Sequence, residues 1–324
     1  YCFGPQPNGP GASGSQHKVN TFGSNVDAAS PAEDVSPNGT QAYGQSETST
    51  AAIGPYVVEQ WNDATGFFSP PCSAGNKDSL TGLGFSNNGG KTFTDLGGPP
   101  NVNCANSAYS GDPSVETWSP SGTPYFYISS LYSVFNSPPG PPFGLLIAIS
   151  ACKGGASLAC NPTPVIISTG GFFNFLDKEF LSIDPVRGLL YVSFTDFTSG
   201  DTIDLVVCDI GGPGGNGTGG LGGTPGTPVC SAPMIVAPSD INGCENEGAY
   251  PGVDLATGDV YVAFEHNWAT NLGSFGPCAT QQVQEQVYQV PGPCATPANI
   301  GTFSSCVPSG FTAVNIVSMD SAFI

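Results

Sequence analysis

The sequence repeats itself four times at nearly constant spacing, and this feature constrains the fold more than any other. The clearest copies are residues 177–194 (DKEFLSIDPVRGLLYVSF) and 247–264 (EGAYPGVDLATGDVYVAF), with looser copies at 112–127 and 47–61. One tyrosine recurs in every copy, and the intervals between successive ones are 69, 66 and 70 residues. These tyrosines are Tyr56, Tyr125, Tyr191 and Tyr261. Self-similarity at a fixed period indicates a repeat architecture.

Each copy has the pattern of a strand, a turn containing glycine, and a second strand rich in β-branched and aromatic residues. A third apolar run follows in three copies, at residues 83–85, 145–149 and 203–207. About four strands per repeat is the composition of a propeller blade. We therefore predict an all-β protein, a β-propeller of four-stranded blades. The less favoured alternative is a β-sandwich with a chance internal duplication.

The expected organisation is an N-terminal extension or closing strand over residues 1–40 and a propeller over 41–324. The expected blades are approximately 45–110, 111–174, 175–243 and 244–310, with a partial fifth at 311–324. Either the ring closes with few blades or further residues complete it. The 45 glycines and 31 prolines disfavour long helices and supply the loops that lengthen each repeat.

A turn motif after the first repeat connects the chain to a known family. Residues 86–93 read SNNGGKTF. This resembles the Asp-box turn, Ser-x-Asp-x-Gly-x-Thr-Trp, of sialidase-like (BNR-repeat) β-propellers. The matching positions are Ser86, Asn88, Gly90, Thr92 and Phe93, with Asn in place of Asp and Phe in place of Trp. In such a turn the short polar side chain accepts backbone N–H groups, so the motif is structural.

The resemblance implies a fold but argues against sialidase chemistry. The family holds the substrate carboxylate with three arginines, because planar guanidinium groups bind carboxylates with two hydrogen bonds. This chain has a single arginine, Arg187, which lies in a predicted turn on the opposite side from the substrate funnel. We therefore expect a non-catalytic member of the superfamily and predict no catalytic residues.

Acidic residues precede the first strand of every repeat. By the family topology these positions face the mouth of the central channel. The candidates for ligand binding at this rim are Glu47, Asp112, Asp177, Glu179, Glu245 and Glu247. They predict a site for a hard cation or for a hydroxyl-rich ligand such as a sugar. The alternative is that these carboxylates are merely hydrated. No cofactor is firmly implied, the metal is unknown, and calcium is the one candidate.

The charge of the chain excludes several partners. With 25 acidic and 6 basic residues, the formal net charge is −19. Such a chain repels phosphate backbones and anionic membrane surfaces, so nucleic acid is not an expected partner. The apolar run at 143–149 is far shorter than a membrane span, and no membrane insertion is expected.

Eleven cysteines and only two histidines favour disulfides over zinc and indicate an oxidising compartment. Close pairs that suit a disulfide within a hairpin or loop are Cys72/Cys104, Cys152/Cys160, Cys208/Cys230 and Cys294/Cys306. Proximity suggests these pairings but does not fix the connectivity. Asn38 and Asn216 begin N-glycosylation motifs. We expect an extracellular or cell-surface protein.

Three functions fit the sequence. The preferred one is a non-catalytic propeller for adhesion, ligand binding or assembly, with a glycan or a protein surface as partner. The second is an exo-acting glycoside hydrolase of sialidase-like fold that uses the rim carboxylates. The third is a structural subunit of a surface filament or layer, formed by self-association. The side chains that line the funnel distinguish between them.

Overall fold

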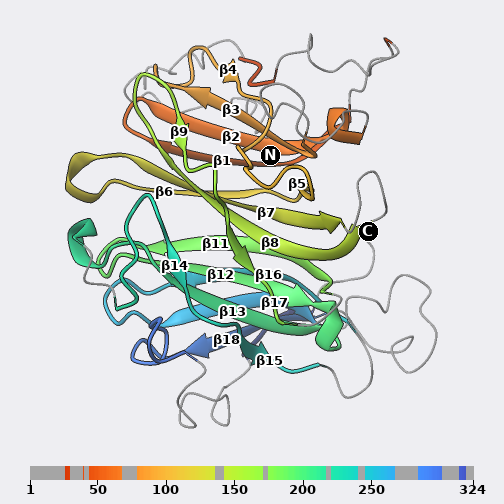
Figure 1. Ribbon diagram of the computed structural model, residues 1–324. Coiled ribbons are helices and arrows are strands. Elements are labelled where there is room, and N and C mark those ends of the chain that lie inside the picture. Colours follow the sequence, from red (N-terminus) through yellow and green to blue (C-terminus); the bar gives the residue numbers. More distant parts are fainter. Residues whose placement is uncertain are drawn as a thin grey trace, which may run out of the picture.

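The structure is a computed structural model of the 324-residue chain. It describes residues 26–29, 39, 44–67, 79–135, 142–170, 174–216, 220–239, 245–266, 284–300 and 314–318. These residues form four antiparallel sheets and contain no α-helix (Figure 1). Four short 3-10 turns lie between strands of the same sheet: η1 (Ala64–Phe67), η2 (Pro120–Gly122), η3 (Phe197–Ser199) and η4 (Pro213–Gly215).

The sheets follow one another along the chain. The first consists of β1 (Gln45–Ile53), β2 (Tyr56–Asp63), β3 (Thr81–Ser86) and β4 (Thr94–Asp95). The second consists of β5 (Ser107–Tyr109), β6 (Ser114–Trp118), β7 (Tyr125–Phe135), β8 (Pro142–Lys153), β9 (Ala159–Cys160) and β10 (Val165–Ile167). The third consists of β11 (Leu176–Asp184), β12 (Leu189–Asp196), β13 (Thr202–Asp209), β14 (Val229–Cys230) and β15 (Met234–Ala237). The fourth consists of β16 (Asn246–Val253), β17 (Val260–His266), β18 (Gln284–Val290) and β19 (Val314–Ser318).

The predicted all-β propeller of small antiparallel sheets is confirmed, with one correction. Residues 314–318 lie in the segment expected to form a partial fifth blade, 311–324. Instead they form β19, which pairs with β18 as the last strand of the fourth sheet. An alternating apolar segment can occupy either position, because its pattern does not name its partner strand.

The larger second and third sheets keep the four-strand plan with interrupted strands. β5 and β6 both pair with β7, so together they take the place of one first strand. β9 and β10 share the outer edge of β8, and β14 and β15 share that of β13. The extra strands are thus pieces of the first and fourth positions of a blade.

The recurring tyrosines lie on β2, β7, β12 and β17, the strands that pair with the inner strands. They do not all occupy the same position along these strands. Ser49 pairs with Gln60, four residues beyond Tyr56, whereas Phe180 pairs with Ser193, two residues beyond Tyr191. In the second sheet Ser114 pairs with Ser129, four residues beyond Tyr125, as in the first sheet. In the fourth sheet Tyr250 pairs with Ala263, two residues beyond Tyr261, as in the third. A shift of two residues keeps the side chain on the same face of a strand. The repeat is therefore real, and unequal hairpins displace its tyrosines along the strand.

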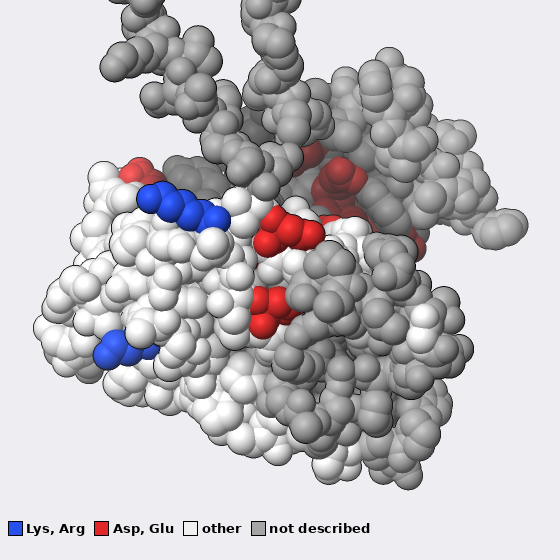
Figure 2. Space-filling model, turned by 90° about the horizontal axis from the view of Figure 1, so that it is seen from above, with Lys and Arg blue, Asp and Glu red and all other residues white. Residues whose placement is uncertain are grey.

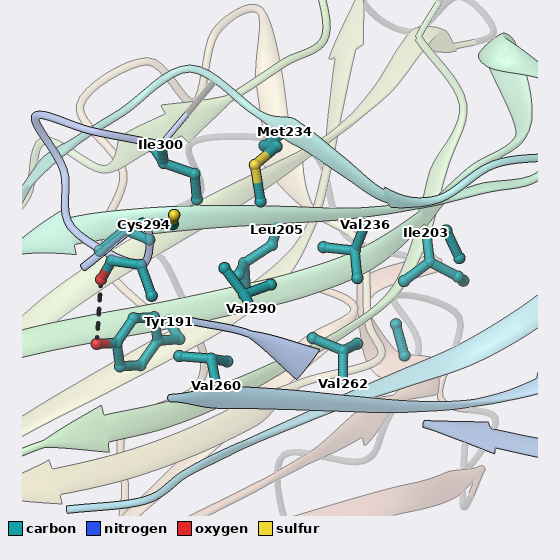
Figure 3. Close-up of a cluster of buried hydrophobic side chains, with 14 of the residues drawn as sticks. Tyr191, Ile203, Leu205, Met234, Val236, Val260, Val262, Val290, Cys294 and Ile300 are labelled. Carbon is teal, nitrogen blue, oxygen red and sulfur yellow. Dashed lines mark hydrogen bonds between the residues drawn. The ribbon is translucent and has the colours of Figure 1, made fainter. Parts of the chain in front are cut away.

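Apolar side chains from neighbouring sheets form one core cluster at each junction. The clusters join the first and second sheets, the second and third, and the third and fourth. Figure 3 shows the last of these, where Ile203 and Leu205 of β13 face Val260 and Val262 of β17. Burial of each such side chain contributes about 1.5–3 kcal/mol, so the junctions hold the sheets in sequence around the pocket described below.

Polar contacts fix the same junctions. The backbone N–H of Val115 donates to Ser49 Oγ at 3.1 Å, and that of Leu181 donates to Ser114 Oγ at 3.3 Å. Ser193 Oγ donates to the carbonyl of Ala249 at 2.7 Å. Each bond links one sheet to the next close to the inner strands, and so sets the relative height of the strands that carry the acidic residues.

Candidate functional site

The inner strands of the first, third and fourth sheets each carry a bulge at the end where the acidic residues lie. In the third sheet Asp177 pairs with Thr195 and Phe180 with Ser193, so two residues of β11 oppose one of β12. The first and fourth sheets show the same irregularity, after Ser46 and after Glu247. The first bulged residue has positive φ in each of these three sheets: Glu47 and Lys178 (both φ 50) and Gly248 (φ 68). In the second sheet Asp112, two residues before β6, has the same positive φ of 50. Bulges turn side chains away from the pleat, and here they turn them toward a common space.

That space is a pocket of about 630 Å³ at the ends of β1, β6, β11 and β16. Its volume lies in the range typical of small-molecule sites, about 300–1,000 Å³. The lining residues are Glu47, Thr48, Ser49, Thr50, Asp112, Pro113, Ser114, Val115, Glu116, Lys178, Glu179, Phe180, Glu247, Gly248, Tyr250 and Glu265. All four sheets therefore contribute to one cavity.

Lys178 ties three of the sheets together across this pocket. Its Nζ lies 2.9 Å from Glu47 Oε2 and 2.8 Å from Asp112 Oδ2. Asn62 Nδ2 donates a further hydrogen bond to Asp112 Oδ1 at 3.1 Å. Burial alone would raise the pKa of Asp112, but the hydrogen bonds from Lys178 and Asn62 outweigh it and hold this pKa below its ordinary value. Asp112 is therefore ionised at neutral pH.

Other carboxyl groups of the pocket have no such cation. Burial, with a further contribution from Asp177, raises the pKa of Glu247 to about 8. Burial also raises the pKa of Glu179 well above its ordinary value, and the charges of Asp112 and Asp177 add to this. The pKa of Asp177 is raised in turn, first by burial and then by Asp112, whose carboxyl group hydrogen-bonds to it. The pocket thus holds protonated and ionised carboxyl groups side by side.

The uncharged wall is divided between hydroxyl groups and aromatic rings. Ser49 follows the bulge of the first sheet, and Phe180 and Tyr250 follow those of the third and fourth. Ser114, the first residue of β6, takes the matching place in the second sheet. The rings of Phe180 and Tyr250 are 4.5 Å apart between centroids and tilted by 36°. Tyr250 is 58% exposed, so one aromatic face remains open to a ligand.

The structure brings together most of the predicted rim acids. Glu47, Asp112, Glu179 and Glu247 line the pocket, and Asp177 lies next to Asp112. Glu245 is not in the lining; it lies near Asp201, whose pKa burial and Glu245 raise to about 6. Their part in ligand binding stays a prediction.

Sequence reasoning missed four contributors to this pocket, and they are Glu116, Lys178, Phe180 and Glu265. Glu116 lies in β6 and could have been found from the strand alternation, since Ser114 and Glu116 share a face. Glu265 is the penultimate residue of β17 and pairs with Glu247, a pairing that the hairpin register would have predicted.

The Asp-box-like turn joins β3 to β4. Ser86 Oγ accepts the N–H groups of Asn88 at 3.3 Å and Gly90 at 3.0 Å, and Asn88 Oδ1 accepts that of Thr92 at 3.0 Å. Gly90 has φ 77, which only glycine adopts without strain. Phe93 follows and is half-buried. These contacts are internal to the turn, which lies outside the pocket lining.

Arg187 does not line the pocket, so it is not placed to bind a substrate carboxylate there. Its Nη1 lies 2.7 Å from Asp184 Oδ2, and its guanidinium donates to the carbonyls of Leu255 and Ala256. It therefore fastens the β11–β12 turn of the third sheet to the β16–β17 turn of the fourth. The remaining polar candidate, His266, hydrogen-bonds through Nδ1 to Asn246 Oδ1 at 2.8 Å.

Disulfides join Cys152 to Cys160 and Cys208 to Cys230. Cys104 and Cys294 are also disulfide-bonded, while Cys72 and Cys306 lie outside the described residues. Disulfides of this kind are typical of an oxidising environment. Of the two glycosylation candidates, Asn216 is exposed and Asn38 lies outside the described residues.

The acidic character extends over the outside of the molecule. Seen from above, acidic side chains lie near the middle of the described surface, and basic ones lie to one side (Figure 2). In the described part of the chain no three of His, Cys, Asp and Glu converge to hold a metal ion, which gives the calcium candidate no support. No helix among the described residues is long and apolar enough to span a membrane.

Comparison with known proteins gives a likeness of chain trace alone. No protein-family model matches the sequence, and no curated protein matches it. Among solved structures, an α-L-arabinanase from Penicillium chrysogenum with arabinobiose is 12% identical, covering 90% of this chain and 70% of its own, with a TM-score of 0.47. An α-L-arabinofuranosidase from Fusarium graminearum with an iminosugar inhibitor is 13% identical, covering 87% and 69%, with a TM-score of 0.49. At these values the likeness says nothing about what this chain binds.

Proposed function

We propose that the chain is a glycoside hydrolase whose pocket carries a general acid, Glu247, and an ionised partner, Asp112. The observation that supports this is the opposite displacement of their pKa values within one cavity. The pKa of Glu247 is raised to about 8, whereas that of Asp112 is lowered. Environments that drive two carboxyl groups toward different protonation states are the basis of acid and base roles in one site.

Glycoside hydrolysis needs this division. A protonated carboxylic acid delivers its proton to the departing glycosidic oxygen, and a carboxylate on the other side stabilises or attacks the sugar carbon. Glu247 keeps its proton at neutral pH because it is buried beside Asp177. Asp112 keeps its charge because Lys178 and Asn62 donate to it. Lys178 is the positioning residue of the pair, since it also holds Glu47 in place.

The rest of the wall suits a sugar. Thr48, Ser49 and Thr50 offer hydroxyl groups along β1, and Tyr250 offers an exposed ring against which a pyranose or furanose face can pack. A sialic acid is not a suitable substrate, because the one arginine of the chain is bound at the β11–β12 turn. The disulfides lead us to propose, in addition, that the enzyme works outside the cell.

The test is turnover of a panel of aryl glycosides by the intact chain. Glu247→Gln should lower kcat/KM by about 10²–10⁴-fold for substrates with poor leaving groups, the usual contribution of general acid catalysis, and by much less for dinitrophenyl glycosides, which leave without a proton. Asp112→Asn should lower it for both kinds of substrate. Glu245→Gln, two residues away and outside the pocket, is the matched control. Sugar binding in the pocket without turnover of any glycoside would refute the hydrolase and leave the non-catalytic glycan-binding propeller.

A further inference from the structure

The balance of charge in the pocket is the starting point. The described residues that line it include six carboxyl groups and one ammonium group, that of Lys178. Lys178 is already engaged by Glu47 and Asp112. Glu116, Glu179, Glu247 and Glu265 therefore share the cavity without a cation from the lining. Carboxyl groups gathered in this way disfavour one another's ionised form unless a positive charge enters.

Glu179 provides a second and independent observation. It is 1% exposed, and neither of its carboxyl oxygens hydrogen-bonds to another described residue. It nevertheless forms part of the pocket wall. An isolated buried carboxyl group costs several kcal/mol, roughly 2–7 for a polar group without a partner. Such a group at the wall of an open pocket indicates that a ligand supplies the missing donor.

We propose that the pocket takes a glycan that carries free amino groups, and that the carboxyl group of Glu179 receives the ammonium of a 2-amino-2-deoxy sugar unit, while Glu247 keeps the proton of the general acid. The inference rests on the proposed function and names its substrate class. A hydrogen bond in which both partners are ionised is shorter and about twice as strong as a neutral one. The exposed ring of Tyr250 packs against the sugar face, as a neutral glycan would also require.

Other ligand classes fit the same observations less well. A uronic acid or sialic acid would bring a further negative charge to a cavity already rich in carboxylates. A neutral sugar would leave Glu179 without a cationic partner. For a metal ion, no three acidic, cysteine or histidine ligands converge among the residues that the structure describes. An organic ammonium, which needs hydrogen-bond acceptors rather than a fixed coordination sphere, is compatible with the separated carboxyl groups.

The first experiment is calorimetric titration of the full chain with three trisaccharides that differ in charge. They are the glucosamine trimer, its N-acetylated neutral counterpart and a galacturonic acid trimer. The glucosamine trimer should bind at least about tenfold more tightly than the neutral one, which corresponds to about 1.4 kcal/mol. The uronate should not bind, and the advantage of the amine should shrink as salt screens the charges. Equal affinity for the amine and N-acetyl forms would overturn the proposal.

Variants locate the effect in the pocket. Glu179→Gln should remove most of the preference for the amine, whereas Glu245→Gln should keep it. If Glu179→Gln does not fold, Glu179→Asp, which keeps the charge but draws the carboxylate back by one methylene group, decides the matter, and an undiminished preference in that variant contradicts the assignment. Stoichiometric calcium binding that displaces the glucosamine trimer would also contradict it, because the carboxylates would then form a metal site.

The two proposals fail separately. Hydrolysis of neutral glycosides without any preference for the amine refutes the substrate class and leaves the hydrolase intact. Binding of the glucosamine trimer with the expected preference, but without hydrolysis of any glycoside, supports the ligand and refutes the enzyme.

Discussion

The third and fourth sheets come from the two most similar repeats, and the same backbone carries different chemistry in each. At the positive-φ position of the bulge the third sheet has Lys178 and the fourth has Gly248. The residue before it is Asp177 in one and Glu247 in the other, and the residue after it is the buried Glu179 in one and Ala249 in the other. The repeat therefore fixes where side chains are presented, while single substitutions decide whether a position supplies a cation, an acid or nothing.

Their packing differs as well. All eight residues of β12 are buried, whereas exposed and half-buried residues alternate with buried ones in β17. Tyr191 is fully buried and its hydroxyl donates to the carbonyl of Ala295 at 3.3 Å, as Figure 3 shows. The matching Tyr261 is 40% exposed. One sheet is enclosed on both faces and the other on one, although their strands read alike.

The largest expected effect tests this difference in enclosure. Tyr191→Ala should lower the free energy of unfolding by about 4 kcal/mol, because it leaves a cavity between the third and fourth sheets. Tyr261→Ala should lower it by about 1 kcal/mol, since much of its ring is already in contact with water. Chemical denaturation of both variants measures the two values. Similar losses would mean that the fourth sheet is covered on both faces in solution.

The next effect concerns the acids before the two bulges. Glu247 has a pKa of about 8 in the folded chain, against an ordinary value of 4.5, so the folded state binds its proton more tightly. Its contribution to stability is complete below the ordinary value and is lost as the pH rises through about 8. We expect a loss of the order of 2 kcal/mol over this window, after allowance for the solvent that reaches the pocket.

Glu247→Gln should flatten that part of the pH profile of the melting temperature. Asp177→Asn should flatten it by less, because Asp177 exchanges a hydrogen bond with Asp112 and a smaller shift is involved. Glu245→Gln should keep the fall toward pH 8, because Glu245 is only a minor cause of the raised pKa of Glu247, and should change mainly the part near pH 6, where Asp201 titrates. A wild-type melting temperature that does not fall between weakly acid and weakly alkaline pH would contradict the raised pKa of Glu247.

The smallest effect compares the two positive-φ residues directly. Gly248→Ala should cost about 1 kcal/mol, because residues with a Cβ are strained in this conformation even where space is open. Lys178→Met should cost about 1 kcal/mol through the lost ion pairs with Glu47 and Asp112, which are partly exposed. Lys178→Gly should cost less than Lys178→Met, since the relief of strain offsets part of the loss. Thermal unfolding at neutral pH ranks the three, and the reverse order for the two lysine variants would show that the strain is negligible.

Much of the fold was predictable because the repeat encodes it locally. The third apolar runs, 83–85, 145–149 and 203–207, lie within β3, β8 and β13. Hairpin length was not predictable, because turns such as Ser119–Pro124 interrupt the alignment of the repeats. The difference in hairpin length displaced the tyrosines by two residues along their strands. The assignment of residues 314–318 failed for a related reason, because strand pairing at an edge is a long-range choice.

The candidate site, too, was only partly predictable from the sequence. The position of the acids before each inner strand predicted their convergence, because equivalent positions in a propeller meet at the axis. Burial could not be predicted: Glu47 and Glu179 are two acidic residues at neighbouring bulge positions, yet one is exposed and paired and the other is enclosed and unpaired. That contrast depends on which side chains fill the space from the next sheet, and a single repeat does not contain this information.

The split outer strands of the second and third sheets affect how readily the protein aggregates at high concentration. β9 and β14 are two residues long, and each carries a cysteine bonded to the long strand beside it. A sheet edge made of such short strands presents no continuous row of unpaired backbone N–H and C=O groups to another molecule. The covalent cross-links keep those fragments in place, and reducing agents would uncover β8 and β13 as templates for strand exchange between molecules.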